Sequence, residues 1–227
     1  MSRDGSNASR HAALMLGATA LGVGLGDLRL LAGLGILSLF GWVWQHPAAI
    51  GSAAQLRGAN AITALRIGLS AALAWLGARG LVPWGGVLVL AVFALDGLDG
   101  WWARRTRTAT PFGAAFDQEA DAFLVTMTSA ALVQAELAPS WVLLTGALRY
   151  GYVLVVHGLR LRGEAPRSTI ARYVFAVLVL CMSAAMLWPS PITRGALRLA
   201  SALLVWSFGR SLWWSWRGPA GRDREQP

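Results

Sequence analysis

Carboxylates crowd into one part of a chain that is otherwise poor in charge. Five of the 11 acidic residues fall within 26 consecutive positions. They are Asp96, Asp99, Asp117, Glu119 and Asp121. Carboxylates in apolar surroundings are unfavourable and also repel one another, so a cluster of this kind requires compensation. Divalent cations supply it directly, which makes a metal site the first hypothesis.

The spacing of four of these residues supports that hypothesis. Asp96 and Asp99 are three positions apart, and Asp117 and Asp121 are four apart, so each pair shares one face of a helix. A short turn before Gly113 brings the two helices back antiparallel, and both acidic faces can then meet in one cleft. Oxygen ligands suit hard cations such as magnesium, and the absence of nearby His or Cys argues against zinc.

The same residues carry a recognisable pattern, Asp-x2-Asp-Gly-x2-Ala-Arg-x8-Gly-x3-Asp-x3-Asp. It is filled by Asp96, Asp99, Gly100, Ala103, Arg104, Gly113, Asp117 and Asp121. This pattern resembles the signature of the CDP-alcohol phosphotransferases at every fixed position and spacing. Upstream, Asn60-Ala-Ile-Thr63-Ala-Leu-Arg66 is similar to the family's Asn-x2-Thr-x2-Arg stretch.

The resemblance implies a reaction and a role for each matched residue. Family members transfer a phospho-alcohol unit from a CDP-linked donor to an acceptor hydroxyl and release CMP. Asp96, Asp99 and Asp117 would hold two divalent ions, magnesium or manganese, while Asp121 would touch one ion and take the acceptor's proton. The residues implied at the nucleotide are Asn60, Thr63, Gly100, Ala103, Arg104 and Gly113. A homodimer is implied by the same resemblance. One departure is Gln118, where many members have proline after the third aspartate.

Composition indicates where such an enzyme would reside. The 227 residues are 56% hydrophobic and 14% charged, with a mean hydropathy of +0.51. Soluble domains carry about 25% charged residues, so a soluble globular enzyme is excluded, as is a disordered chain. Apolar stretches of about 20 residues recur, the length that a bilayer requires of a helix. We expect an all-α, polytopic membrane helix bundle.

The apolar stretches divide the chain into an extension and a six-span core. The six predicted spans are about Ala61–Leu76, Gly85–Trp102, Ala114–Ala135, Trp141–Leu161, Tyr173–Leu187 and Ala196–Trp213. Before them, His11–Gln45 is too long for one span, which favours a hairpin of two helices over a cleaved signal peptide. We therefore divide the chain into an N-terminal extension and linker (1–58), a core (59–217) and a polar tail (218–227).

Every basic residue is an arginine, and the 20 arginines give a formal charge of +9. They lie between apolar spans rather than along one solvated stripe, which argues against nucleic acid. Alternate loops carry most of them, so the positive-inside rule places that side, and the acidic cluster with it, in the cytoplasm. The compact length suggests a bacterial inner membrane. Tryptophans, Trp42 among them, fall at predicted span ends, which is typical of interfacial anchors.

The acceptor is the least specified substrate. Arg149 sits within an apolar run and must be compensated. We hypothesise that Arg149, with Arg167 or Arg172, holds an acceptor phosphate, because guanidinium groups match phosphate oxygens. Glycerol 3-phosphate or an inositol phosphate would fit, with CDP-diacylglycerol as donor; a neutral alcohol such as serine is the alternative. Glu119 lies off the face of Asp117 and Asp121 and is expected to be structural or to pair with an arginine.

Two other classes of function stay open. A transporter or channel could line a cation path with the four aspartates, but no matching acids occur toward the other membrane face. An inactive scaffold could keep the fold, but the intact signature argues against lost chemistry. Single residues add little: Cys181 cannot form an intrachain disulfide, and His11, His46 and His157 suggest no chemistry.

Overall fold

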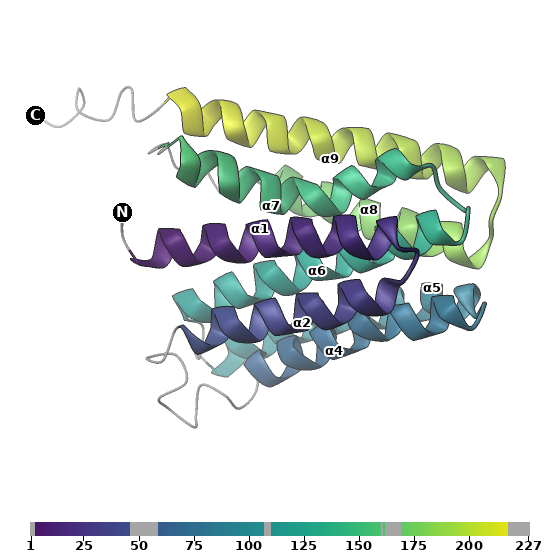
Figure 1. Cartoon of the computed structure of the whole chain (residues 1–227), viewed down its shortest axis with the longest axis horizontal. Coiled ribbons are helices and arrows are strands. Elements are labelled where there is room, and N and C mark those ends of the chain that lie inside the picture. The colour runs from purple at the N-terminus through teal and green to yellow at the C-terminus, as the bar shows by residue number, and fades with distance from the viewer. Residues whose placement is uncertain (1–2, 46–58, 107–109, 160, 162–168, 218–227) are drawn as a thin grey trace, which may run out of the picture.

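The chain folds as a bundle of helices that run nearly parallel or antiparallel to one another (Figure 1). The computed structural model describes residues 3–45, 59–106, 110–159, 161 and 169–217, and this part contains no strand. The expected all-α fold is therefore confirmed. Helix α1 begins, and helix α9 ends, at the same end of the bundle (Figure 1).

The N-terminal extension forms the predicted helical hairpin. Helix α1 spans Arg3–Gly24 and helix α2 spans Leu28–Trp44. Asp27 caps α2: its carboxylate accepts hydrogen bonds from the backbone N–H and from Nε of Arg29, each at 2.9 Å. Gly26 has a φ of +67°, which glycine adopts without the strain that a side chain would bring. A three-residue turn thus reverses the chain.

Six helices follow in the places where six spans were expected. They are α4 (Ala59–Ala78), α5 (Val82–Thr106), α6 (Pro111–Gln134), α7 (Leu143–Gly158, preceded by the short helix η1, Ser140–Val142), α8 (Thr169–Leu187) and α9 (Pro191–Arg217). By length and hydropathy, α4, α5 and α8 each contain a segment able to cross a membrane. That all six helices cross it stays a prediction. Many large apolar side chains point outward, such as Leu37, Ile192 and Leu199, as lipid contact would require.

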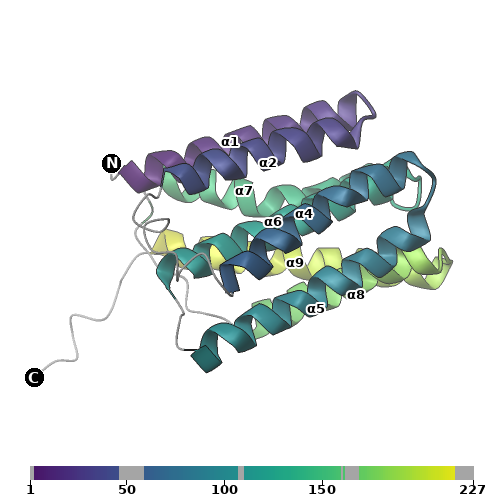
Figure 2. The same ribbon diagram turned by 90° about the horizontal axis from the view of Figure 1, so that it is seen from below.

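Helix α6 lies at the centre of the bundle. The hairpin of α1 and α2 covers one side, and α5 with α8 lies on the opposite side (Figure 2). From Ala122 to Leu132 every residue of α6 is buried, and Phe123, Met127 and Leu132 have no exposed surface. The acidic positions of α6 precede this segment, so the helix holds them at one end of a closely packed core.

Small residues let the hairpin approach α6 closely. A Cβ atom on Gly35 of α2 would lie 2.6 Å from the ring of Phe123 and 3.4 Å from the Met15 methyl group. Trp42, expected at the membrane interface, is instead 7% exposed and stacks on Phe112 and Phe116 at ring-centroid distances of 5.6 and 6.5 Å. The interfacial prediction is wrong for Trp42, because the hairpin folds back over the start of α6.

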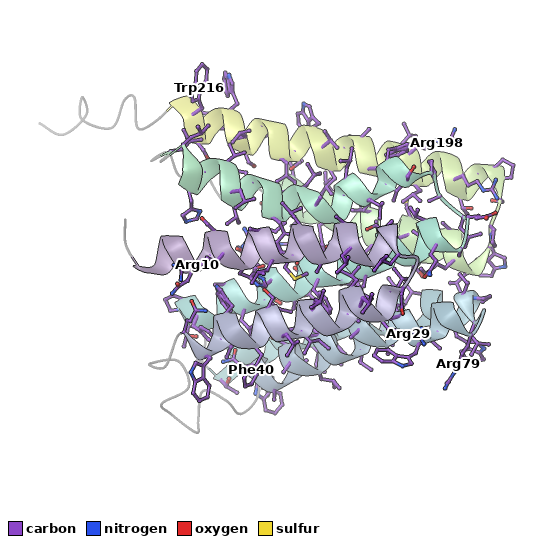
Figure 3. All side chains as sticks on the ribbon, in the orientation of Figure 1. Arg10, Arg29, Phe40, Arg79, Arg198 and Trp216 are labelled. Carbon is purple, nitrogen blue, oxygen red and sulfur yellow. The ribbon has the colours of Figure 1, made fainter. Side chains whose placement is uncertain are left out.

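Several of the described arginines lie toward one end or the other of the bundle, whereas Arg66 lies near the middle of α4. Arg10 lies toward the end where α1 begins, and Arg29, Arg79 and Arg198 lie toward the other end (Figure 3). Asp96 lies past the midpoint of α5 and Asp117 lies in the second turn of α6, and α5 ends and α6 begins at the end of the bundle where α1 begins (Figure 2). The acidic cluster is therefore displaced toward one face of the bundle.

The close contact between α5 and α8 leaves no room for a side chain at Gly86. A Cβ atom there would lie 2.8 Å from Leu187 Cγ and 3.0 Å from the Ser183 carbonyl oxygen. We expect Gly86→Ala to destabilise the protein by about 1–3 kcal/mol through overpacking. Gly68→Ala on α4, where nothing lies within 4 Å, serves as the control. Thermal unfolding in detergent compares them, and equal midpoints would contradict the close packing.

Candidate functional site

Three of the signature carboxylates meet in space. Asp96 from α5 and Asp117 and Asp121 from α6 each offer an oxygen, and these oxygens all lie within 4.8 Å of one another. The arrangement follows from the sequence spacing, since Asp117 and Asp121 lie one helical turn apart and α6 returns antiparallel to α5. The two acidic faces expected to converge are thus brought together at these three residues.

A buried arginine links the three carboxylates. Arg66 of α4 donates from Nη1 to Asp117 Oδ1 at 2.5 Å, and its Nη2 lies 2.9 Å from Asp96 Oδ1. The same Nη2 also donates to Asp121 Oδ1. One helical turn further along α4, Ser70 donates to the Arg66 carbonyl oxygen at 2.7 Å. Arg66 thereby ties α4 to both acidic helices.

The site has a closed side and an open side. The Arg66 side chain is 1% exposed, whereas those of Asp96, Asp117 and Asp121 are 29%, 38% and 25% exposed. Three carboxylates and one guanidinium leave a formal charge of −2 facing the open side. Oxygens bound to one magnesium or calcium ion can lie about 4–5 Å apart, so the three aspartates fit a hard divalent cation.

The start of α4 supplies a second wall. Asn60 and Thr63 are three residues apart on α4 and share a face with Arg66. A Cβ atom on Gly113 would lie 3.1 Å from the Asn60 side-chain oxygen and 3.2 Å from Thr110 Oγ1. Thr110 caps α6 by accepting a hydrogen bond from the Gly113 N–H at 3.0 Å. A Cβ atom at position 113 would thus be crowded by both side-chain oxygens, and glycine eases the close approach of the starts of α4 and α6.

Other predicted site residues are only partly covered by the structure. Gly100 lies on α5 one turn after Asp96, on the same face. Asp99, Ala103 and Arg104 lie on α5, but their side chains are outside the described part of the chain. Arg167 falls outside the described residues altogether, so the second proposed ion ligand and one proposed acceptor arginine stay predictions.

A cavity opens beside Asp121. Its volume is about 280 Å³, and residues of α6, α7, α8 and α9 line it. Polar groups on its wall include Asp121, Gln118 and Arg149, and the rest of the wall is mainly apolar, with Phe175 and Phe208 among the residues. Asp121 therefore belongs both to the carboxylate group and to this cavity. Arg172, exposed at the start of α8, does not line it.

Arg149 has the acidic partner that its apolar surroundings require. Its Nη2 donates to Glu119 Oε1 at 2.8 Å, and the Arg149 side chain is 25% exposed. Glu119 thus pairs with an arginine, as its position on α6 suggested. Within the described residues, Nε of Arg149 is buried without a hydrogen-bond partner, so one donor of the guanidinium stays free.

Two participants were not assigned from sequence. Arg66 stood in the quoted Asn-x2-Thr-x2-Arg stretch but received no role; an arginine in the middle of a predicted span was the available signal. The second is His11, to which the sequence analysis assigned no chemistry. Its Nε2 lies 3.3 Å from Glu119 Oε2. No sequence signal pointed to that contact, because 108 positions separate the two residues.

Comparison with known proteins agrees with the geometry. Residues 56–213 match the family model for CDP-alcohol phosphatidyltransferase. The chain is similar to a CDP-diacylglycerol–glycerol-3-phosphate 3-phosphatidyltransferase of Pseudomonas fluorescens, with 31% identity over 151 residues that cover 59% of this chain and 77% of the relative. A Bacillus subtilis (strain 168) protein of the same description is 36% identical over 77 residues, 34% of this chain and 38% of that relative. No solved structure matches.

The ion pairs of Arg66 predict how its loss would affect stability. Arg66→Met would leave three clustered carboxylates without a counter-charge, at a penalty of about 3–5 kcal/mol. We expect a lowered unfolding temperature in detergent with EDTA, and partial recovery when millimolar magnesium is added, since a cation can replace the lost charge. Exposed Arg172→Met is the control. An Arg66→Met protein as stable as that control would show that the cluster needs no buried cation.

Proposed function

Because the chain belongs to the CDP-alcohol phosphatidyltransferase family, we propose that it transfers the phosphatidyl group of CDP-diacylglycerol to a phosphorylated alcohol, with release of CMP. Glycerol 3-phosphate is the first acceptor to test, since both described relatives are named for it. The observation that carries this proposal is the convergence of Asp96, Asp117 and Asp121, whose oxygens lie within 4.8 Å of one another.

The aspartates would bind the diphosphate of the donor through divalent ions. Asp96, Asp99 and Asp117 would hold two such ions, magnesium or manganese, and Asp121 would touch one of them. Bound there, the ions would neutralise the diphosphate and stabilise the charge that develops on departing CMP. Arg66 supports this role because it fixes the carboxylates from behind and leaves their exposed sides open.

The nucleotide would lie along the starts of α4 and α6. Asn60 lies against Gly113 there, Thr63 follows one turn later on α4, and Gly100 lies on the face of α5 that carries Asp96. We assign the cytidine and its phosphates to these residues, with Ala103 and Arg104 completing the pocket. The close approach of Asn60 to Gly113 supports the assignment, because it brings together the starts of two of the helices that would hold the nucleotide.

Asp121 is the proposed general base. The acceptor's hydroxyl oxygen attacks the phosphorus that carries diacylglycerol, its proton passes to the Asp121 carboxylate, and the phosphorus–oxygen bond to CMP breaks. CMP leaves with the electron pair of that bond. The position of Asp121 supports this role, because among the signature aspartates whose side chains the structure describes it is the one that lines the cavity of about 280 Å³ and so can meet an acceptor there.

Arg149 would bind the phosphate of the acceptor. It lines the same cavity as Asp121, its side chain is 25% exposed, and a guanidinium suits phosphate oxygens. The volume lies near the lower limit for small-molecule sites, which run from about 300 to 1,000 Å³, so a compact phosphorylated alcohol fits better than a bulky one. The predicted contributions of Arg167 and Arg172 extend this proposal toward the start of α8.

The proposal extends to the membrane in which the protein resides and to its orientation there. We place it in a bacterial inner membrane with the carboxylate cluster facing the cytoplasm, where a water-soluble acceptor is available. The end of α5 with the stretch that joins it to α6, and the stretch that joins α7 to α8, are rich in arginine in the sequence, and the cluster is displaced toward the end of the bundle where α5 ends and α6 begins, which supports this orientation. A homodimer follows from the family resemblance.

Loss of the base gives the first test of the reaction. We expect Asp121→Asn to lower the rate of CMP release from CDP-diacylglycerol and glycerol 3-phosphate at least about 100-fold. Asp27→Asn, at the hairpin turn toward the opposite end, should keep the rate of the wild type. CMP release by purified protein in detergent with magnesium measures both. Near-normal turnover by Asp121→Asn, or turnover unaffected by EDTA, would overturn the assignment.

The acceptor assignment predicts a selective defect. Arg149→Met should raise KM for glycerol 3-phosphate about 10- to 100-fold, the worth of one charged hydrogen bond to phosphate, while KM for CDP-diacylglycerol stays near that of the wild type. The variant is combined with Glu119→Gln so that no buried charge is left unpaired. Steady-state rates with each substrate varied give the two constants. A wild-type protein that uses serine but no phosphorylated alcohol would contradict the acceptor class.

A further inference from the structure

A histidine of the N-terminal hairpin lies buried behind the proposed acceptor site. His11 of α1 is 4% exposed. Its Nδ1 lies 2.7 Å from Ser38 Oγ of α2, so a hydrogen bond joins the two hairpin helices. Its Nε2 lies 3.3 Å from Glu119 Oε2 of α6. The imidazole therefore bridges the hairpin and the central helix through polar contacts at both nitrogens.

Glu119 carries this contact onward to Arg149. One carboxylate oxygen faces His11, and the other accepts the hydrogen bond from Arg149 Nη2 at 2.8 Å. The Glu119 side chain is only 9% exposed, so its charge requires compensation, which the Arg149 guanidinium supplies. A continuous set of polar contacts thus runs from Ser38 through His11 and Glu119 to the guanidinium that lines the cavity.

The position of these contacts in the sequence separates them from the shared family core. The family match begins at residue 56, so Ser38 and His11 lie in the part that it does not cover. Apolar packing already attaches the hairpin to α6, because Gly35 lies against the Phe123 ring and the buried Met15 side chain reaches the same glycine. Burying an imidazole and a carboxylate is more costly than burying apolar groups of similar size, so attachment alone does not explain them.

We propose that the hairpin forms part of the acceptor site, with His11 and Glu119 as positioning residues that fix the Arg149 guanidinium toward the cavity. This inference rests on the proposed function, in which Arg149 binds an acceptor phosphate. A long arginine side chain loses rotamer freedom when it binds, and a guanidinium held beforehand loses less. The hairpin would therefore raise the affinity for the phosphorylated acceptor without touching it.

Two substitutions at His11 test the proposal in full-length protein. His11→Phe keeps a ring of similar size but loses both polar contacts. We expect it to raise KM for glycerol 3-phosphate about three- to tenfold, with kcat and KM for CDP-diacylglycerol within about twofold of the wild type. His11→Gln places an amide N–H near the position of Nε2 and should restore most of the affinity. A purely structural role would not give this split or this rescue.

A matched control separates positioning from packing. Met15→Ala, one turn further along α1, loosens the hairpin against Phe123 without touching Glu119. It should lower the unfolding temperature in detergent while leaving KM for glycerol 3-phosphate unchanged. If His11→Phe instead lowers only the unfolding temperature, as Met15→Ala does, or raises KM for CDP-diacylglycerol by the same factor, the hairpin serves packing and the inference is wrong.

A double-variant cycle tests whether His11 acts on Arg149 through Glu119. If His11 acts through Glu119, then adding His11→Phe to Glu119→Gln should change KM for glycerol 3-phosphate by less than about twofold. Additive effects would contradict that route. The proposed function is tested separately by the wild type: if it releases CMP with neither glycerol 3-phosphate nor inositol phosphate, the proposed function fails and the inference fails with it. Wild-type turnover with an unaffected His11→Phe variant overturns the inference alone.

Discussion

The structure depends on the compensation of negative charge inside a helix bundle. Asp96, Asp117 and Asp121 approach one another at a depth where water cannot solvate all of their surface, and mutual repulsion would separate α5 from α6. The buried guanidinium of Arg66 contacts all three and removes one unit of the charge. The remainder faces an open side, so the cluster leaves room for a divalent cation, as a closed ion-pair network would not.

The same constraint explains why α4 lies where it does. An arginine can meet three carboxylates on two other helices only if its own helix packs against both, and Arg66 does so near the middle of α4. Packing at that distance brings the start of α4 against the start of α6, where Gly113 leaves room for Asn60. The two stretches of the family signature are thus held together by one ion-paired side chain.

The sequence predicted the helices well and the cluster in part, for different physical reasons. Helix positions follow from hydropathy and length, which are local properties, so the hairpin and the six core helices could be predicted from the sequence. The convergence of the aspartates followed from helical periodicity and a short turn. Contacts between side chains of different helices could not be predicted from the sequence. Arg66 meets Asp117 at a separation of 51 residues, and Trp42 is buried only because α2 folds over α6. Such contacts depend on how helices pack.

Helix α6 separates its acidic residues between two arginines. Asp117 and Asp121 face Arg66 on α4, whereas Glu119 faces Arg149 on α7, because residues two apart on a helix point in different directions. Asp121 alone takes part in both regions, since it pairs with Arg66 and also lines the cavity that contains Arg149. In the proposed reaction the donor diphosphate lies on the first side and the acceptor phosphate on the second. The hydroxyl that joins them must then lose its proton at the boundary, and Asp121 is the carboxylate that stands there.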